Sequence, residues 1–235
     1  MTATDSALVA AIAAQLAAVR QRIELAALAA GRRPDSVKLM AVSKTKPAEA
    51  VRAAFAAGCR DFGENYLQEG LDKALALAEL PLCWHFIGPI QSNKTRPIAE
   101  QFDWVHSLDR LKVAQRLSAQ RPASKGPLNV CLQFNVSAET SKSGVAGDEL
   151  EQLAAAVIAL PKLRLRGLMA IPAPSDDPVQ QRTAFAAVRQ ALEKLQQRWP
   201  QLDTLSMGMS ADLEAAIEEG ATIVRVGTDI FGARG

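Results

Sequence analysis

The sequence predicts a (β/α)8 barrel, also called a TIM barrel, with one extra N-terminal helix in front of it. Short apolar runs of strand length alternate with stretches of helical periodicity along the whole chain of 235 residues. Polar residues that suit a ligand site follow these runs, at the strand ends where a barrel of this kind builds its sites. The expected class is therefore α/β, organised as a single barrel domain over residues 1–235.

The individual elements follow from the spacing of apolar residues. Apolar side chains from Leu8 to Ile23 recur at helical spacing and Gly31 supplies a stop, so the first 31 residues are expected to form the extra helix. Eight strands are expected at residues 37–44, 61–65, 84–90, 104–107, 129–136, 165–171, 204–209 and 222–228. Seven helices are expected between them, near residues 47–58, 66–79, 93–102, 109–120, 147–160, 178–199 and 211–219.

A doubly wound open sheet is the main alternative to a barrel. Such a sheet usually has fewer strands and often carries a glycine-rich first turn. Neither a GxGxxG sequence nor a Walker motif follows the first expected strand at residues 37–44. The strand count and this first turn both favour the barrel.

Composition and charge exclude several classes of function. The net charge of +2 gives no general attraction to nucleic acid or membrane, and no segment has the layout of a signal peptide or a membrane span. Cys59, Cys83 and Cys131 lie far apart without CxxC spacing, which is typical of reduced thiols in a cytoplasmic protein. With only His85 and His106 beside them, no metal site is expected. Since no long exposed apolar helix demands a dimer, a monomer is expected.

Lys44 is the most informative single residue. It ends the first apolar run, and Pro47 opens the helix that follows. An amine at the carboxyl end of a buried strand points into the mouth of a barrel, where it is partly desolvated and can form a Schiff base with an aldehyde. A lysine reaching into solvent and a point charge that binds phosphate are the alternatives.

The last two strands end in segments that suit a phosphate group. Residues 206–210 contain small residues that let the backbone approach an anion, and Ser210 can also cap the helix expected from Ala211. Gly227 and Thr228 add two N–H groups and a hydroxyl. A simple serine N-cap and a plain strand-to-loop turn are the alternatives.

Arg225 lies between Val224 and Val226 in the eighth run. Because side chains alternate along a strand, Arg225 faces the barrel interior when the two valines face the outer helices. A buried guanidinium requires an acceptor, which is either a protein group in a structural salt bridge or a ligand atom near the phosphate site.

One cofactor uses all of these groups, namely pyridoxal 5'-phosphate (PLP). Its aldehyde suits Lys44, its phosphate suits Ser210, Gly227 and Thr228, and its ring nitrogen suits Arg225.

The sequence also resembles a known family at several motifs that cover almost the whole chain. It is similar to the YggS/PROSC family of pyridoxal-phosphate homeostasis proteins at residues 41–47, 62–66, 84–94, 167–171, 206–210 and 224–232. The resemblance implies the fold of the N-terminal barrel of alanine racemase. It also implies an aldimine on Lys44, phosphate contacts from Ser210, Gly227 and Thr228, a ring-nitrogen contact from Arg225, and a pocket lined by Asn65, His85 and Met209.

By the same resemblance, the chain is expected to buffer PLP or deliver it to apo-enzymes in vitamin B6 homeostasis, with effects on amino-acid pools and without established catalytic activity. The alternative is a small PLP-dependent racemase-like enzyme, which needs an acid or base on each face of the substrate. The chain ends at Gly235 soon after the last expected strand, so no added domain is expected to supply a second base. The only tyrosine, Tyr66, begins a helix, and His85 stays open as an opposing base. An arginine at the ring nitrogen keeps its own proton, which weakens the cofactor as an electron sink.

Overall fold

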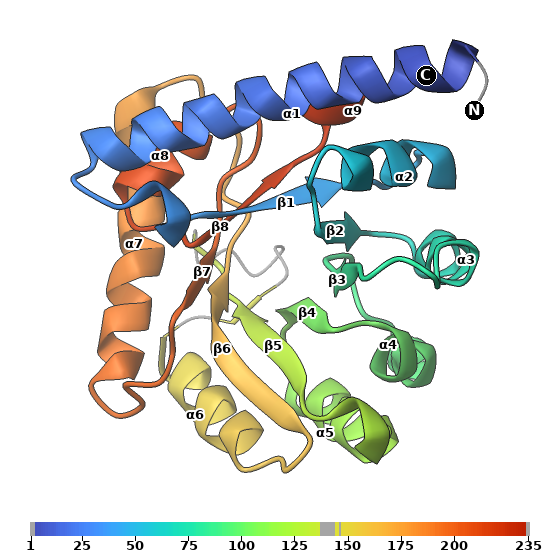
Figure 1. Ribbon diagram of the computed structural model, residues 1–235. Helices are drawn as coiled ribbons and strands as arrows, with labels where there is room; N and C mark the ends of the chain where they lie inside the picture. The colour runs from blue at the N-terminus through green and yellow to red at the C-terminus, as the bar shows by residue number, and fades with distance from the viewer. Residues whose placement is uncertain (1–2, 137–143, 146, 234–235) are drawn as a thin grey trace.

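The structure is a computed structural model, and it describes residues 3–136, 144–145 and 147–233. Eight parallel strands form a closed barrel in the order β1 to β8, and helices surround it (Figure 1). The predicted (β/α)8 barrel with an extra N-terminal helix is therefore confirmed. The strands are β1 Lys38–Val42, β2 Asp61–Glu64, β3 Cys83–Phe86, β4 Trp104–Leu108, β5 Leu128–Gln133, β6 Leu163–Met169, β7 Thr204–Ser206 and β8 Ile223–Val226.

Helix α1 precedes the first strand, α9 follows the last, and the other helices lie between consecutive strands. The α-helices are α1 Ala3–Ala29, α2 Ala48–Ala56, α3 Leu67–Ala76, α4 Thr95–Gln101, α5 Leu111–Gln120, α6 Gly147–Ile158, α7 Pro178–Gln196, α8 Leu213–Glu218 and α9 Thr228–Phe231. Short 3-10 turns are η1 Pro34–Ser36, η2 Ser92–Lys94 and η3 Ala123–Lys125.

Six of the eight strands, all except β4 and β6, are shorter than the apolar runs that predicted them. The first run covers residues 37–44, yet β1 ends at Val42, so that Lys44 lies in the loop beyond the strand. The eighth run also changes conformation, since β8 ends at Val226 and α9 begins at Thr228. Apolar residues continue past the hydrogen-bonded part of a strand because they still pack against neighbours there, so hydrophobicity overestimates strand length.

The main apolar core lies between the barrel and its ring of helices. Leu16 and Val19 of α1 are buried in this layer, together with apolar residues of the strands. Helix α1 packs across α2, α8 and α9 (Figure 1). Since α8 and α9 follow the loops after β7 and β8, the extra helix supports the part of the barrel that carries the predicted phosphate site.

Arg22 of α1 ties these two loops together. Its guanidinium donates to Glu214 Oε1 over 2.7 Å, to Asp229 Oδ2 over 2.6 Å and to the Ser210 carbonyl over 2.9 Å. The three acceptors lie near the starts of α8 and α9. No helix among residues 3–233 that the structure describes has the length and apolar character needed to span a membrane.

Candidate functional site

A cavity of about 320 Å³ lies at the carboxyl ends of the barrel strands. It is lined by residues at the ends of β1, β6 and β8 and in the segments after β1, β2, β3, β6, β7 and β8. Seven of the eight predicted site residues line it, and these are Lys44, Asn65, Met209, Ser210, Arg225, Gly227 and Thr228. The barrel thus brings together side chains that are up to 184 positions apart in the chain (from 44 to 228).

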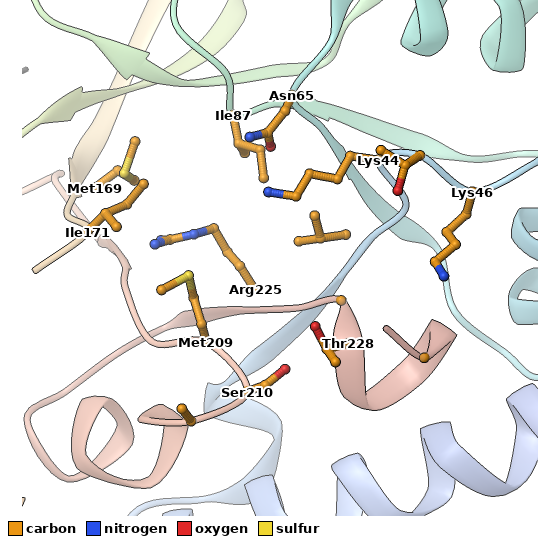
Figure 2. Close-up of a pocket in the computed structure, with 15 residues that line it drawn as sticks. Lys44, Lys46, Asn65, Ile87, Met169, Ile171, Met209, Ser210, Arg225 and Thr228 are labelled. Carbon is orange, nitrogen blue, oxygen red and sulfur yellow. The ribbon is translucent and has the colours of Figure 1, made fainter. Parts of the chain in front are cut away.

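Lys44 extends into this cavity from the loop after β1 (Figure 2). In Figure 2 its amine lies between Asn65, Ile87 and Arg225. The next residue, Thr45, has a φ of 64°, in the left-handed region that a threonine rarely adopts. Such strain persists only where other contacts hold the chain.

Two side chains of α3 hold the backbone on either side of Lys44. The Thr45 N–H donates to Glu69 Oε2 over 2.8 Å, and Lys73 Nζ donates to the Ser43 carbonyl over 2.7 Å. Lys73 also pairs with the buried Glu64 carboxylate over 2.8 Å. These contacts hold the loop from which the Lys44 side chain extends into the cavity.

Ser210 and Thr228 face one another across one end of the cavity (Figure 2). Thr228 begins α9, whose first N–H groups have no partner within the helix. Gly227 lies close to β1, since a Cβ atom built on it would stand 3.2 Å from the Val42 carbonyl oxygen. Two hydroxyls and the start of α9 thus lie at this end of the cavity.

The predicted helix-capping role of Ser210 is wrong. Helix α8 begins at Leu213, and its N-cap residue is Asp212. Asp212 Oδ1 accepts a hydrogen bond from the Met209 N–H over 2.6 Å and closes the turn that contains Ser210. The Ser210 side chain is therefore not needed to cap α8.

Arg225 is buried in the barrel interior, as the alternation of β8 predicted. Its Nη1 donates to the carbonyl and the hydroxyl of Ser206, and its Nη2 donates to the Ala170 carbonyl over 2.9 Å. Burial lowers the pKa of Arg225 to about 10, so it stays charged at neutral pH. Protein acceptors take three of its five N–H groups, and no acceptor among the described residues takes the remaining two, at Nε and Nη2.

Asn65 carries a second unused polar atom. Its Oδ1 is buried and has no hydrogen-bond partner among the described residues. The segment after β3 passes close to the Asn65 backbone, because a Cβ atom on Gly88 would stand 2.0 Å from the Asn65 carbonyl oxygen. Buried polar atoms without partners are uncommon in proteins, and here one lies beside a cavity.

His85 does not line the cavity, which corrects the prediction from the sequence. Its side chain is fully buried deeper in the barrel, between Asp61 and His106. The residue pairs in register with Gly63, below the level at which Asn65 and Lys44 leave their strands. Alternation along β3 gives the inward direction of the His85 side chain. Its depth in the barrel depends on how the neighbouring strands are staggered.

Several lining residues are not among the site residues that the sequence predicted. Ile87, Met169 and Ile171 form apolar walls, and Lys46 adds a second lysine whose Nζ donates to the Ala233 carbonyl over 2.9 Å. Met169 and Ile171 lie at the end of the sixth apolar run, where the rule that strand ends line the site places them. From the sequence alone, apolar residues that line a cavity cannot be distinguished from apolar residues of the core.

The cavity suits an anionic ligand. Its described lining contains three cationic side chains, Lys44, Lys46 and Arg225, and no carboxylate. Cations that converge in a partly desolvated cavity attract anions more strongly than surface charges do.

The fold and the site define a barrel of the alanine racemase type with a cationic cavity and a lysine at its mouth. The family model for the alanine racemase N-terminal domain matches residues 14–235. The chain belongs to this family and, within it, to the pyridoxal phosphate homeostasis proteins, as similarity to their members shows.

Three relatives illustrate the match. The pyridoxal phosphate homeostasis protein of Pseudomonas aeruginosa is 67% identical over 95% of this chain and 96% of its own length. The protein of that name in Escherichia coli K12 is 56% identical over 95% of this chain and 97% of its own length. PipY of Synechococcus elongatus PCC7942, solved with PLP bound, is 40% identical with a TM-score of 0.82, covering 94% of this chain and 100% of that one.

Proposed function

We propose that this chain, acting as one domain over residues 1–235, binds PLP covalently and reversibly through Lys44 and buffers or delivers it in vitamin B6 homeostasis. The observation that carries this proposal is the convergence on one cavity of the Lys44 amine, the hydroxyls of Ser210 and Thr228, and the unused N–H groups of Arg225. The similar protein PipY has been solved with PLP bound, which supports the same ligand here.

The residues present fit this cofactor at each of its polar ends. Ser210, Gly227 and Thr228 supply donors suited to a phosphate, and Arg225 retains donors suited to a ring nitrogen. The buried Oδ1 of Asn65 has no partner among the described residues and is an acceptor for a ligand hydroxyl. Ile87, Met169 and Met209 provide apolar walls for a flat ring.

PLP, when bound, supplies an aldehyde that condenses with a primary amine and exchanges that amine for another. Lys44 supplies the amine, and its position at the mouth of the barrel leaves it open to exchange. Arg225 keeps its proton on the guanidinium, because its pKa of about 10 lies well above neutrality. It therefore donates to the ligand without transferring a proton, which disfavours carbanion chemistry.

The lining of the cavity supports a carrier rather than a racemase. Racemisation needs an acid or base on each face of the reacting carbon. Lys44 and Lys46 are the only titratable amines in the described lining, which contains no histidine, tyrosine, cysteine or carboxylate. Lys46 is engaged with the Ala233 carbonyl, and His85, the one opposing base left open by the sequence, lies outside the cavity.

Proton exchange at the α-carbon of L-amino acids in D2O distinguishes the two functions. We expect the PLP-loaded protein to exchange this proton no faster than free PLP at the same concentration. Lys44→Ala serves as the matched control. Exchange faster than free PLP that disappears in Lys44→Ala would establish the enzyme and overturn the carrier.

The proposed setting is the cytoplasm, where the free thiols of Cys59, Cys83 and Cys131 stay reduced. The proposed partners are PLP and apo-enzymes that require it, with the chain acting as a monomer. Transfer is tested by mixing the PLP-loaded protein with an apo-enzyme and a scavenger of free PLP. Recovery of enzyme activity in the presence of the scavenger supports direct delivery, and recovery only without it contradicts direct delivery.

A further inference from the structure

A chain of hydrogen bonds runs through the barrel interior from Arg225 to Asp61. Arg225 Nη1 donates to the Ser206 hydroxyl over 3.0 Å, and this hydroxyl lies 2.9 Å from His106 Nδ1. His106 Nε2 lies 2.9 Å from His85 Nδ1, and His85 Nε2 lies 2.9 Å from Asp61 Oδ1. Asp61 is the first residue of β2, whereas the cavity lies at the carboxyl ends of the strands. The chain therefore connects the two ends of the barrel.

The carboxylate at one end of the chain sets the direction of every link through the two neutral imidazoles. An ionised Asp61 only accepts, so His85 carries its proton on Nε2 and accepts at Nδ1 from His106. His106 then accepts at Nδ1 from the Ser206 hydroxyl, whose oxygen accepts from Arg225. A guanidinium only donates, which agrees with this direction at the other end.

The surroundings keep the two imidazole rings neutral and fixed. Both rings are fully buried, and Trp104 lies against them at ring-centroid distances of 5.5 Å to His85 and 5.6 Å to His106. Burial lowers the pKa of His85 and lowers that of His106 well below its ordinary value. Asp61 stays ionised because the hydrogen bonds from His85 and Lys38 outweigh the opposing effect of burial and lower its pKa.

We propose that Ser206, His106, His85 and Asp61 are positioning residues that hold Arg225 in the orientation required for binding PLP, an inference that rests on the proposed function. The chain and the neighbouring carbonyls bind one side of the guanidinium and leave its Nε and one Nη2 N–H available. With both imidazoles neutral and every hydrogen bond pointing toward Asp61, the Ser206 hydroxyl oxygen accepts a hydrogen bond from Arg225. If His106 carried its proton on Nδ1, the Ser206 hydroxyl would lose its acceptor, and the orientation of the oxygen that accepts from Arg225 would no longer be fixed.

The direction of the chain is testable without PLP, because His85 and His106 are the only two histidines of the protein. Long-range 1H–15N correlation of histidine-labelled full-length protein at pH 7 should show two neutral rings, both protonated at Nε2. A charged ring, or a ring protonated at Nδ1, would overturn the proposal. This readout is independent of any failure of the proposed function.

The positioning role is tested with Ser206→Ala, which removes one hydroxyl and keeps the carbonyl that Arg225 also uses. We expect the dissociation constant of PLP to rise about tenfold, the effect of one hydrogen bond of ordinary strength. In wild-type protein, PLP should also shift the ring 15N resonances of His106, and Ser206→Ala should abolish that shift. Ser118→Ala, another buried serine that lies on α5, is the matched control and should change neither quantity.

Asp61→Ala provides a second variant at the far end of the chain. It should raise the dissociation constant in the same direction and relax the single tautomer of His85, although Asp61 is not among the residues that line the cavity. Unchanged PLP binding in both folded variants would overturn the positioning role. Wild-type protein that does not bind PLP would overturn the proposed function. Wild-type protein that binds PLP with the same affinity as both variants would overturn only the positioning role.

Discussion

Replacing Lys73 by methionine should destabilise the protein strongly, because it leaves a buried carboxylate without its cation. The Lys73 side chain is 8% exposed and that of Glu64 is fully buried, and their charged atoms lie 2.8 Å apart. After the change, Glu64 Oε1 keeps only the 2.6 Å bond from the Ser43 hydroxyl, and Glu64 Oε2 has no partner among the described residues. Removing one member of a buried pair typically costs about 3–5 kcal/mol, a large part of the stability of an ordinary domain.

This cost should depend on pH in a defined direction. Burial raises the pKa of Glu64 above its ordinary value of 4.5, although Lys73 opposes the shift, so Lys73→Met should raise this pKa further. A carboxyl whose pKa is raised in the folded state binds its proton more tightly there than in the unfolded chain. The free energy of unfolding of Lys73→Met should therefore increase as the pH falls through the raised pKa toward 4.5.

Urea unfolding at pH 7 and at pH 5 measures both effects. The double variant Glu64→Gln with Lys73→Met removes the charge and should recover much of the loss, while Lys112→Met on the exposed face of α5 should change little. A loss in Lys73→Met of less than about 1 kcal/mol, the usual value of an exposed pair, would refute the reasoning. A double variant that is no more stable than the single one would also refute it.

Three further perturbations test other parts of the structure. Leu16→Ala in the buried face of α1 should lower the free energy of unfolding by about 2–5 kcal/mol in urea, and a loss below the range for core residues would contradict its packing role. Gly208→Ala should destabilise the loop after β7, because φ is 91° there and the new Cβ would stand 2.5 Å from Ala216 Cβ; an unchanged melting temperature would contradict this. Arg225→Lys should raise the dissociation constant of PLP about tenfold in equilibrium dialysis, since an ammonium lacks the planar array of donors, and equal affinity would show that Arg225 does not contact the ligand.

Sequence patterns predicted the barrel and five of the site residues that line the cavity, for reasons that are local, and the family resemblance added Asn65 and Met209. A strand that ends in a polar residue places that residue at one rim of the barrel, so Lys44 and Thr228 could be placed at the same rim before any contact was known. The alternation around Arg225 likewise gives its inward direction from three neighbouring residues.

The features that the sequence did not predict depend on the stagger between strands or on distant contacts. The depth of His85 follows from its register with Gly63, which no local pattern encodes. The contact of Arg22 with the Ser210 carbonyl spans 188 positions, so the role of α1 in holding the phosphate loop becomes visible only in the folded chain. The short helix α9 replaced the end of the eighth predicted strand because Thr228 starts a turn that apolar periodicity does not detect.

Borohydride reduction of the PLP-loaded protein followed by peptide mapping tests the central claim most directly. Reduction makes the bond between the cofactor and its lysine permanent, so the labelled residue reports where PLP was held. The account predicts a pyridoxyl group on Lys44 in wild-type protein and no such label on the corresponding peptide of Lys44→Ala. A label confined to another lysine, such as Lys46 at the same cavity, would contradict it.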